Sequence, residues 1–160
     1  MQEFIFKKID NGTFSLVEYN GNEENVVIPD IHAGQPVTVL YDRIFRGHEE
    51  IQSIKIPDTV TDIGGFVFDG CCNLKQISLP AGLLYLWQYA FCRSSIEELI
   101  LPEGIRTIAP YTFKECKSLK RLVCNPGLIE IKARAFESCS RELEVVASEK
   151  TLISPEAWGE

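Results

Sequence analysis

The residues of this 160-residue chain best suited to chemistry are six cysteines and two histidines. They could form disulfides or a zinc site, since thiolate sulfur and imidazole nitrogen are preferred zinc ligands. Their spacing favours neither, because the sequence has no C-x-x-C pair and only His32 and His48 to add to the cysteines. We therefore expect no bound metal, no cofactor and no essential disulfide.

Three of the cysteines recur at one position of a repeating pattern, and a residue that recurs with a repeat is usually a small buried core group. That position holds His48, Cys71, Ser94, Cys116 and Cys139. Cys116 and Cys139 belong to successive repeats, so a bridge between them stays open. Cys72 and Cys92 fall where other repeats are polar, and we expect their thiols to be exposed.

Catalytic motifs are sparse in this sequence. His48 could act as a general base, but it shares the repeat position of the buried cysteines, which favours a partly buried packing role. The Gly64-Gly65 pair follows a short apolar pair, which is typical of a turn rather than of a phosphate-binding loop. The chain shows neither a serine–histidine–aspartate order nor a paired-carboxylate motif on a suitable element. We therefore do not expect an enzyme.

Length and composition describe one ordinary globular domain. The chain is 45% hydrophobic and 24% charged, and its 16 basic and 23 acidic residues give a net charge of −7. An acidic balance argues against nucleic acid as a partner, because phosphate contacts need excess lysine and arginine. The sequence also lacks an apolar stretch of about 18 residues that could span a membrane.

An internal repeat of 22 or 23 residues organises the whole chain. Its clearest row is aromatic and consists of Phe45, Phe68, Phe91, Phe113, Phe136 and Trp158. A second row lies five residues earlier and consists of Leu40, Ile63, Leu86, Ile108, Ile131 and Ile153. A unit this short cannot bury its apolar face alone, so the period predicts a solenoid whose stacked coils share one core.

Each coil is expected to hold two short strands and a turn. The segment Ser53–Ile56 alternates polar and apolar residues, as a half-buried strand does, and Pro57 ends it. The pair around Val60–Ile63 predicts a second brief strand, and the Phe-x-x-Cys segment predicts one helical or 3₁₀ turn. The pattern thus predicts a β-rich solenoid with about five coils whose strands pair in parallel.

The two ends of the chain differ from the middle, as solenoid caps do. Residues 1–24 are expected to form a hairpin cap around Asp10-Asn11-Gly12, and residues 25–160 the solenoid, within one domain. The first coil is five residues longer than the others, and we place that insertion in the loop Asp30–Pro36. Trp158 is expected to seal the last open face.

Two coils carry the motif of a known family. Ile54 to Leu74 reads IKIPDTVTDIGGFVFDGCCNL and Leu99 to Leu119 reads LILPEGIRTIAPYTFKECKSL. They resemble the pattern I-x-I-P-x-x-V-x-x-I-G-x-x-A-F-x-G-C-x-x-L of the BspA-like, or Treponema pallidum-type, bacterial leucine-rich repeats, over about residues 25–158. The resemblance implies a right-handed leucine-rich-repeat solenoid of the α/β type. It also implies a non-enzymatic adhesion or interaction module that is secreted or displayed at the cell surface.

The N-terminal sequence leaves the compartment open. MQEFIFKKIDNG contains acidic Glu3 and lacks the basic region and the apolar run of a secretory signal. A cytoplasmic protein is expected if Met1 is the true start, whereas the family resemblance implies a secreted or surface protein whose signal was removed.

The outward positions of the first strands could recognise a partner on a concave sheet. One row runs through Val27, Lys55, Ser78, Ile100, Val123 and Val146, and the adjacent row includes Glu98, Arg121 and Glu144. The last three coils thus present an apolar stripe edged by alternating charge. Strand propensity alone is one explanation, and a contact surface for a protein or a second copy of the chain is the other.

Aromatic residues outside the core row could form a second surface. Trp87 stands where other coils have glycine or alanine, Tyr85 and Tyr89 flank it, and Tyr111 shares the register of Tyr89. They either shield the convex side or bind a partner, since aromatics with polar tips are favoured at interfaces. The sequence therefore predicts a non-enzymatic binding or adhesion module for protein, with a carbohydrate-binding module that uses Trp87 as the alternative.

Overall fold

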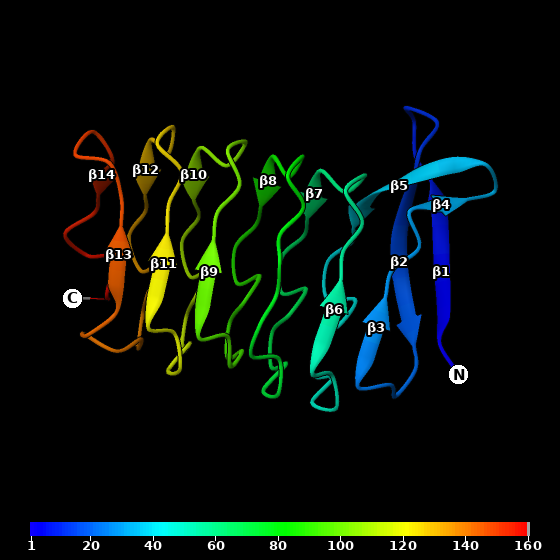
Figure 1. Ribbon diagram of the computed structural model, residues 1–160, viewed down its shortest axis with the longest axis horizontal. Helices are drawn as coiled ribbons and strands as arrows, with labels where there is room; N and C mark the ends of the chain where they lie inside the picture. The colour runs from blue at the N-terminus through cyan, green and yellow to red at the C-terminus, as the bar shows by residue number, and fades with distance from the viewer. Residues whose placement is uncertain (160) are drawn as a thin grey trace.

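The protein is a β-solenoid of about six turns in a computed structural model that describes residues 1–159. Figure 1 shows the coils stacked along the long axis, from the blue N-terminal hairpin to the red C-terminal end. One side holds β3 (Asn25–Val27), β6 (Ser53–Lys55), β9 (Glu98–Ile100), β11 (Arg121–Val123) and β13 (Glu144–Val146). We call this the first sheet side.

The second sheet side holds the other strand of each coil. Its members are β2 (Phe14–Asn20), β5 (Gln35–Leu40), β7 (Asp62–Ile63), β8 (Tyr85–Leu86), β10 (Thr107–Ile108), β12 (Glu130–Ile131) and β14 (Leu152–Ile153). Strands of successive coils pair in parallel on both sides, as predicted; for example, Leu122 pairs with Leu99 and Val145. The third side of the solenoid consists of turns.

The aromatic row forms the centre of the core. The five phenylalanines of the row are fully buried, and neighbouring rings lie with centroids 5.1–6.0 Å apart. Trp158 continues the row at 5.0 Å from Phe136, but its ring is tilted and only partly buried. Tyr19 extends the row at the other end, 5.1 Å from Phe45. The ladder is therefore confirmed, with one aromatic residue more than the repeat predicts.

The predicted helical turns are wrong, and so is the count of about five coils. Residues 1–159 contain no helix, and hence none that could cross a membrane. In the middle coils, the residue two before each core phenylalanine and the residue two after it have positive φ. Left-handed residues cannot continue a right-handed helix, so the segment folds as successive tight turns. The residues before the ring are Arg43, Phe66, Tyr89, Tyr111 and Arg134.

The N-terminal hairpin is confirmed and is built into the solenoid. β1 (Glu3–Lys8) pairs antiparallel with β2, and β2 then pairs in parallel with β5. The hairpin thus supplies the first strand of the second sheet instead of only covering it. The insertion lies where the sequence places it, since β4 (Ile31–His32) turns back antiparallel onto the start of β5.

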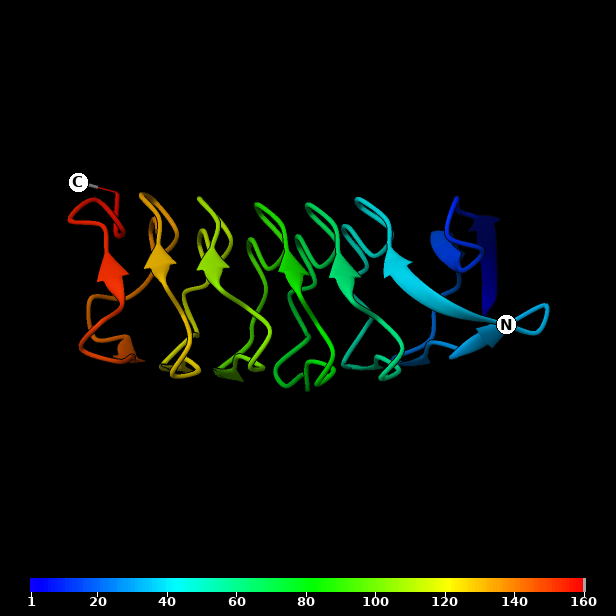
Figure 2. The ribbon, with the colours of Figure 1, turned by 90° about the horizontal axis from the view of Figure 1, so that it is seen from above.

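Both sheets are interrupted in the middle of the solenoid. On the first side, β3–β6 and β9–β11–β13 are separate sheets, and within residues 1–159 the intervening segment 76–78 pairs with neither. On the second side, the sheet ends at β8 and a new one starts at β10, and Figure 2 shows the wider spacing between these strands. The turn side continues through the junction, where Phe91 N donates to Thr112 O at 3.0 Å.

A shorter loop accompanies the interruption of the first sheet. Phe91 and Ile96 are five positions apart, whereas Phe68 and Leu74, like Phe113 and Leu119, are six apart. The missing residue lies in the loop that leads into β9. One backbone bond still crosses from this coil to the one before it, since Glu97 N donates to Lys75 O at 3.0 Å, but the ladder does not extend further along the strand.

Candidate functional site

The apolar stripe of the first sheet side is built as the sequence predicts for the last three coils. Val123 is the register partner of both Ile100 and Val146, so the three side chains form one row. Ile100 is 64% exposed and Val146 37%, while Val123 between them is half-buried. The row is a continuous apolar surface held on three hydrogen-bonded strands.

Charged side chains form the adjacent row on the same face. Arg121 lies between two carboxylates, with Nη1 at 3.4 Å from Glu98 Oε1 and Nε at 3.2 Å from Glu144 Oε2. All three side chains are exposed, so the pairs stabilise the fold little and remain open to a partner. The arrangement provides an apolar strip with a polar edge, which is the usual composition of a protein interface.

The row does not continue over the whole length of the solenoid. Lys55 pairs in register with Val27 on the separate β3–β6 sheet, and Ser78 lies in the unpaired segment. The row of outward positions is therefore divided between two separate sheets, with Ser78 in the unpaired segment between them. The candidate surface reduces to β9, β11 and β13.

The aromatic patch divides into two parts. Tyr85 and Trp87 are 55% and 54% exposed on the second sheet side, with ring centroids 6.4 Å apart. Tyr89 and Tyr111 instead lie on the turn side, stacked at 4.8 Å and partly buried. Of these four aromatic residues, Tyr85 and Trp87 are the ones with freely accessible rings.

The two tyrosines of the turn side belong to a second stack. The sequence shows their shared register, but the sequence-based grouping with Trp87 missed the separate stack. Phe66 stacks on Tyr89 at 4.4 Å, Arg43 lies over Phe66 at 5.1 Å, and Lys114 lies over Tyr111 at 5.6 Å. Burial and then the neighbouring Tyr111 raise the pKa of Tyr89. The stack closes the turn side with cations at both ends, and the recurrence of these residues two positions before the core ring was the available signal.

A buried carboxylate on the same side was also missed. Asp69 is 1% exposed, and its oxygens accept hydrogen bonds from Arg46 Nε at 2.9 Å and from Arg93 Nε and Nη2, each at 2.9 Å. The bonds to Asp69 raise the pKa of Arg93 above its ordinary value. Asp69 therefore ties three successive coils together. Its signal was the row one residue after the core ring, where Arg46, Asp69, Cys92, Lys114 and Glu137 follow one another.

The recurring cysteines hydrogen-bond the backbone of the preceding coil. The thiols of Cys71, Cys116 and Cys139 donate to the carbonyls of the core phenylalanines one coil earlier, at 3.2, 2.9 and 2.9 Å respectively. All six cysteines lie within residues 1–159 and are free thiols in this structure. The expectation of an exposed Cys92 is wrong: its side chain is buried and contacts Asp69. Cys72 is exposed, as predicted.

Burial makes most of these thiols unreactive. It raises the pKa of Cys71 to about 12 and the pKa values of Cys124 and Cys139 to about 11. Burial also raises the pKa of Cys116. Burial, followed by the Asp69 carboxylate, raises the pKa of Cys92 to about 12. Since the thiolate is the nucleophile, the five thiols combine low access with a low thiolate fraction near neutral pH.

We expect an aromatic disulfide reagent at pH 8 to label one thiol quickly in the native protein, and that thiol to be Cys72. In denaturant without reductant all six should react, because none is bridged. Cys72→Ser should remove the fast phase and leave the slow one unchanged. Two or more thiols that fail to react in denaturant would contradict the prediction.

His48 has an ordinary structural environment. Its Nδ1 lies 2.6 Å from Glu50 Oε1, and its ring packs edge-on against Tyr19 with centroids 5.1 Å apart. Within residues 1–159, no group of three or more histidine, cysteine, aspartate or glutamate side chains is placed to hold a metal ion.

Comparison with known proteins identifies the family. The model of the BspA-type leucine-rich repeat region matches six copies over residues 38–158. The chain belongs to this family. A search of the curated proteins found no match.

Three solved structures show the same fold. A leucine-rich repeat protein of T. pallidum is 24% identical, with a TM-score of 0.75 and coverage of 94% of this chain and 82% of the other. A leucine-rich cell surface protein of Faecalibacterium prausnitzii is 22% identical, with a TM-score of 0.63 and coverage of 96% and 53%. The pneumococcal vaccine antigen PcpA is 20% identical, with a TM-score of 0.66 and coverage of 92% and 36%. The chain thus spans about half of the second protein and a third of the last.

Proposed function

We propose that the protein is a non-enzymatic binding module that recognises a protein partner through the outer face of β9, β11 and β13. The observation that carries the proposal is the apolar row of Ile100, Val123 and Val146. Lys55 and Ser78 hold the same repeat position with polar side chains, so the repeat itself does not require an apolar residue there. Exposed apolar residues in one contiguous row are typical of an interface.

The charged row gives this surface its specificity. Glu98, Arg121 and Glu144 satisfy one another in the free protein and lie beside the apolar row. A partner with a basic group can pair with either glutamate, whereas a partner with an acidic group there meets two like charges. The family and the names of its solved neighbours, a cell surface protein and a vaccine antigen, support a role in adhesion at a cell surface.

The test is the double variant Ile100→Asp, Val123→Asp. We expect it to fold but to lose at least about tenfold in affinity, because two buried charges would face the partner. The measurements are capture of bound proteins from bacterial and host extracts, and self-association by size-exclusion chromatography with light scattering. A second copy of the chain is included because a two-fold axis allows one patch to meet itself.

Val27→Asp is the matched control. Val27 is likewise an exposed outward valine on the first sheet side, but it lies on the separate β3–β6 sheet. It should leave binding unchanged. A folded double variant that elutes like the parent and retains all of its partners would refute the proposal and leave the row as strand propensity.

A second candidate function is carbohydrate binding. The observation that favours it is the pair of accessible rings of Tyr85 and Trp87 on the opposite side of the molecule. Tyr89 and Tyr111, which the sequence grouped with them, are occupied in the turn-side stack. Substitution of Trp87 should matter little for a protein partner and strongly for a glycan.

A further inference from the structure

The interruption between β8 and β10 leaves backbone groups without their usual partners. At the junctions on either side, Trp87 N donates to Ile63 O at 3.1 Å and Lys132 N donates to Ile108 O at 3.0 Å. The equivalent donor at the end of β10 is Ala109 N. At the start of the same strand it is Arg106 N, which corresponds to Leu84 N and Ile129 N of the neighbouring coils. Among residues 1–159, neither Ala109 N nor Arg106 N has a backbone acceptor. Donors on the β10 edge and carbonyls on the β8 edge therefore face each other across open space.

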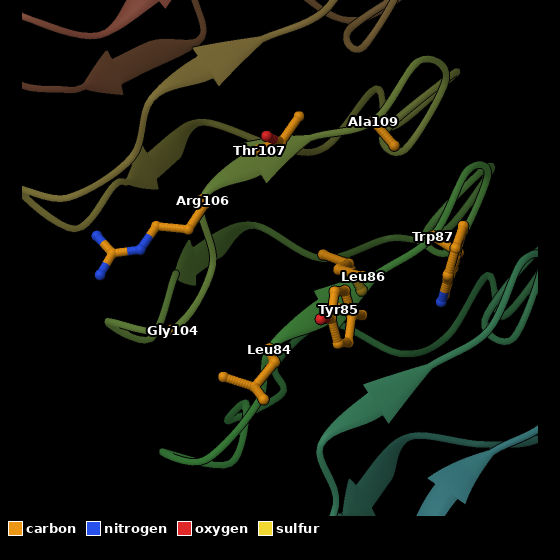
Figure 3. A pocket seen from close by; sticks show the side chains of 8 residues that line it. All are labelled: Leu84, Tyr85, Leu86, Trp87, Gly104, Arg106, Thr107 and Ala109. Atoms are coloured by element: carbon orange, nitrogen blue, oxygen red, sulfur yellow. The ribbon is translucent and has the colours of Figure 1, made fainter.

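This space is a cleft with two unlike walls. Its volume is about 430 Å³, within the range of roughly 300–1,000 Å³ for small-molecule sites. One wall is residues 84–87, with the large side chains of Leu84, Tyr85 and Trp87; the other is residues 104–109, with glycine, threonine and alanine beside Arg106 (Figure 3). Large rings opposite small residues leave room for a ligand.

The cleft is closed at both ends, which limits what it can hold. At one end Gly104 lies so close to Leu83 that a Cβ there would be 2.5 Å from the Leu83 carbonyl oxygen. At the other end the hydrogen bond from Phe91 N to Thr112 O rejoins the coils. The opening is only about four residues long, so an extended peptide strand cannot run through it. A ligand the size of one or two rings fits its length.

The chemistry of the walls matches a saccharide. The stacked rings of Tyr85 and Trp87 offer flat apolar faces with polar tips, which suit the C–H face of a sugar ring. Backbone N–H and C=O groups on the two edges suit hydroxyls, because each hydroxyl both donates and accepts. The cleft lining contains no carboxylate within the described chain, and Arg106 at its rim is held by a hydrogen bond from Nη1 to Gly127 O at 3.0 Å.

We propose that this cleft is a carbohydrate subsite, with a pyranose ring stacked on Trp87 and its hydroxyls paired to the free backbone edges of β8 and β10. The proposal deepens the second candidate function and rests on it, and it is independent of the protein-binding face. Binding of this kind should be weak, since one ring buries little area, and we expect a Kd on the order of 1 mM.

Isothermal titration calorimetry tests the subsite with neutral hexoses, N-acetylhexosamines and their disaccharides. Trp87→Ala should weaken the best ligand about tenfold, because it removes the stacking face. Ala109→Leu should weaken it as much by filling the opposite wall. Tyr41→Ala is the matched control and should change nothing, because Tyr41 is 55% exposed at the same register position two coils earlier, outside the cleft.

The possible results distinguish failure of the cleft as the binding site from failure of carbohydrate binding itself. If no saccharide binds the parent at millimolar concentrations, the subsite and the carbohydrate function both fail, and the protein-binding face is untouched. If a saccharide binds the parent but Trp87→Ala and Ala109→Leu bind it equally well, carbohydrate binding stands and the cleft is not its site. Loss in both variants, with retention in Tyr41→Ala, supports the proposal.

Discussion

Phe91→Ala is expected to lower the free energy of unfolding by about 3–5 kcal/mol, the range for removing a buried aromatic ring. Phe91 is fully buried, and its ring stacks between Phe68 at 5.1 Å and Phe113 at 5.7 Å. Each coil of a solenoid is stabilised by its two neighbours, so a cavity at this point weakens two interfaces at once. Urea unfolding followed by circular dichroism measures the loss.

Two further variants test whether the loss at Phe91 depends on its buried position in the middle of the ring ladder. Trp158→Ala removes a tilted, partly buried ring from the end of the ladder and should cost less, because only Phe136 stacks on it. Tyr41→Ala removes an exposed ring and should change the free energy of unfolding by less than about 0.5 kcal/mol. A loss of under about 1 kcal/mol for Phe91→Ala would show that the phenylalanine row is not the core.

Asp69→Ala should be the most damaging substitution of a charged residue, with a loss of about 2–3 kcal/mol. It removes three hydrogen bonds between charged groups and disconnects Arg46 and Arg93 from the coil between them. The two arginines are about half-exposed and become hydrated, so the loss falls below that for stranding a fully buried charge. Because the carboxylate itself is buried, 1 M NaCl should weaken the effect only partly.

Glu137→Ala is the matched control for Asp69. Glu137 holds the same register position and pairs with Lys114 at 3.2 Å and Arg134 at 3.1 Å, but all three side chains are more accessible than Asp69. Its removal should cost much less than the removal of Asp69, and salt should reduce that cost, because accessible ion pairs are screened by solvent and ions. Equal losses for the two variants would contradict the central role of Asp69.

The repeat made most of the fold predictable. An apolar residue type that returns every 22 or 23 positions indicates a buried position of the repeat. The phenylalanine row, the parallel strands and the outward stripe of Ile100, Val123 and Val146 therefore follow from spacing alone. The turn geometry did not follow, because the sequence gives no sign that Phe66 and Tyr89 have positive φ. Cys92 was misjudged because its row is otherwise polar and a polar row was expected to be exposed, whereas Asp69, the member of that row one coil earlier, is itself buried and contacts the Cys92 thiol.

The cleft was beyond prediction from sequence. Trp87 and Tyr85 were recognised as a surface, but the space beside them arises from the absence of pairing between β8 and β10. Pairing between strands of successive coils depends on small displacements of one coil relative to the next. The loop between Phe91 and Ile96 shows where the spacing changes, but the spacing alone does not tell which strands lose their pairing.

The turn side, continuous where both sheets are interrupted, determines how the molecule bends. At this junction the strands are unpaired on two of the three sides of the solenoid, while the turn side keeps its backbone hydrogen bonds. Bending about the turn side at this junction breaks the fewest backbone hydrogen bonds, whereas bending elsewhere must open a paired sheet. We therefore expect any bending at this junction to change the angle between the half that carries β3 and β6 and the half that carries β9, β11 and β13, and each half to keep its own surface intact.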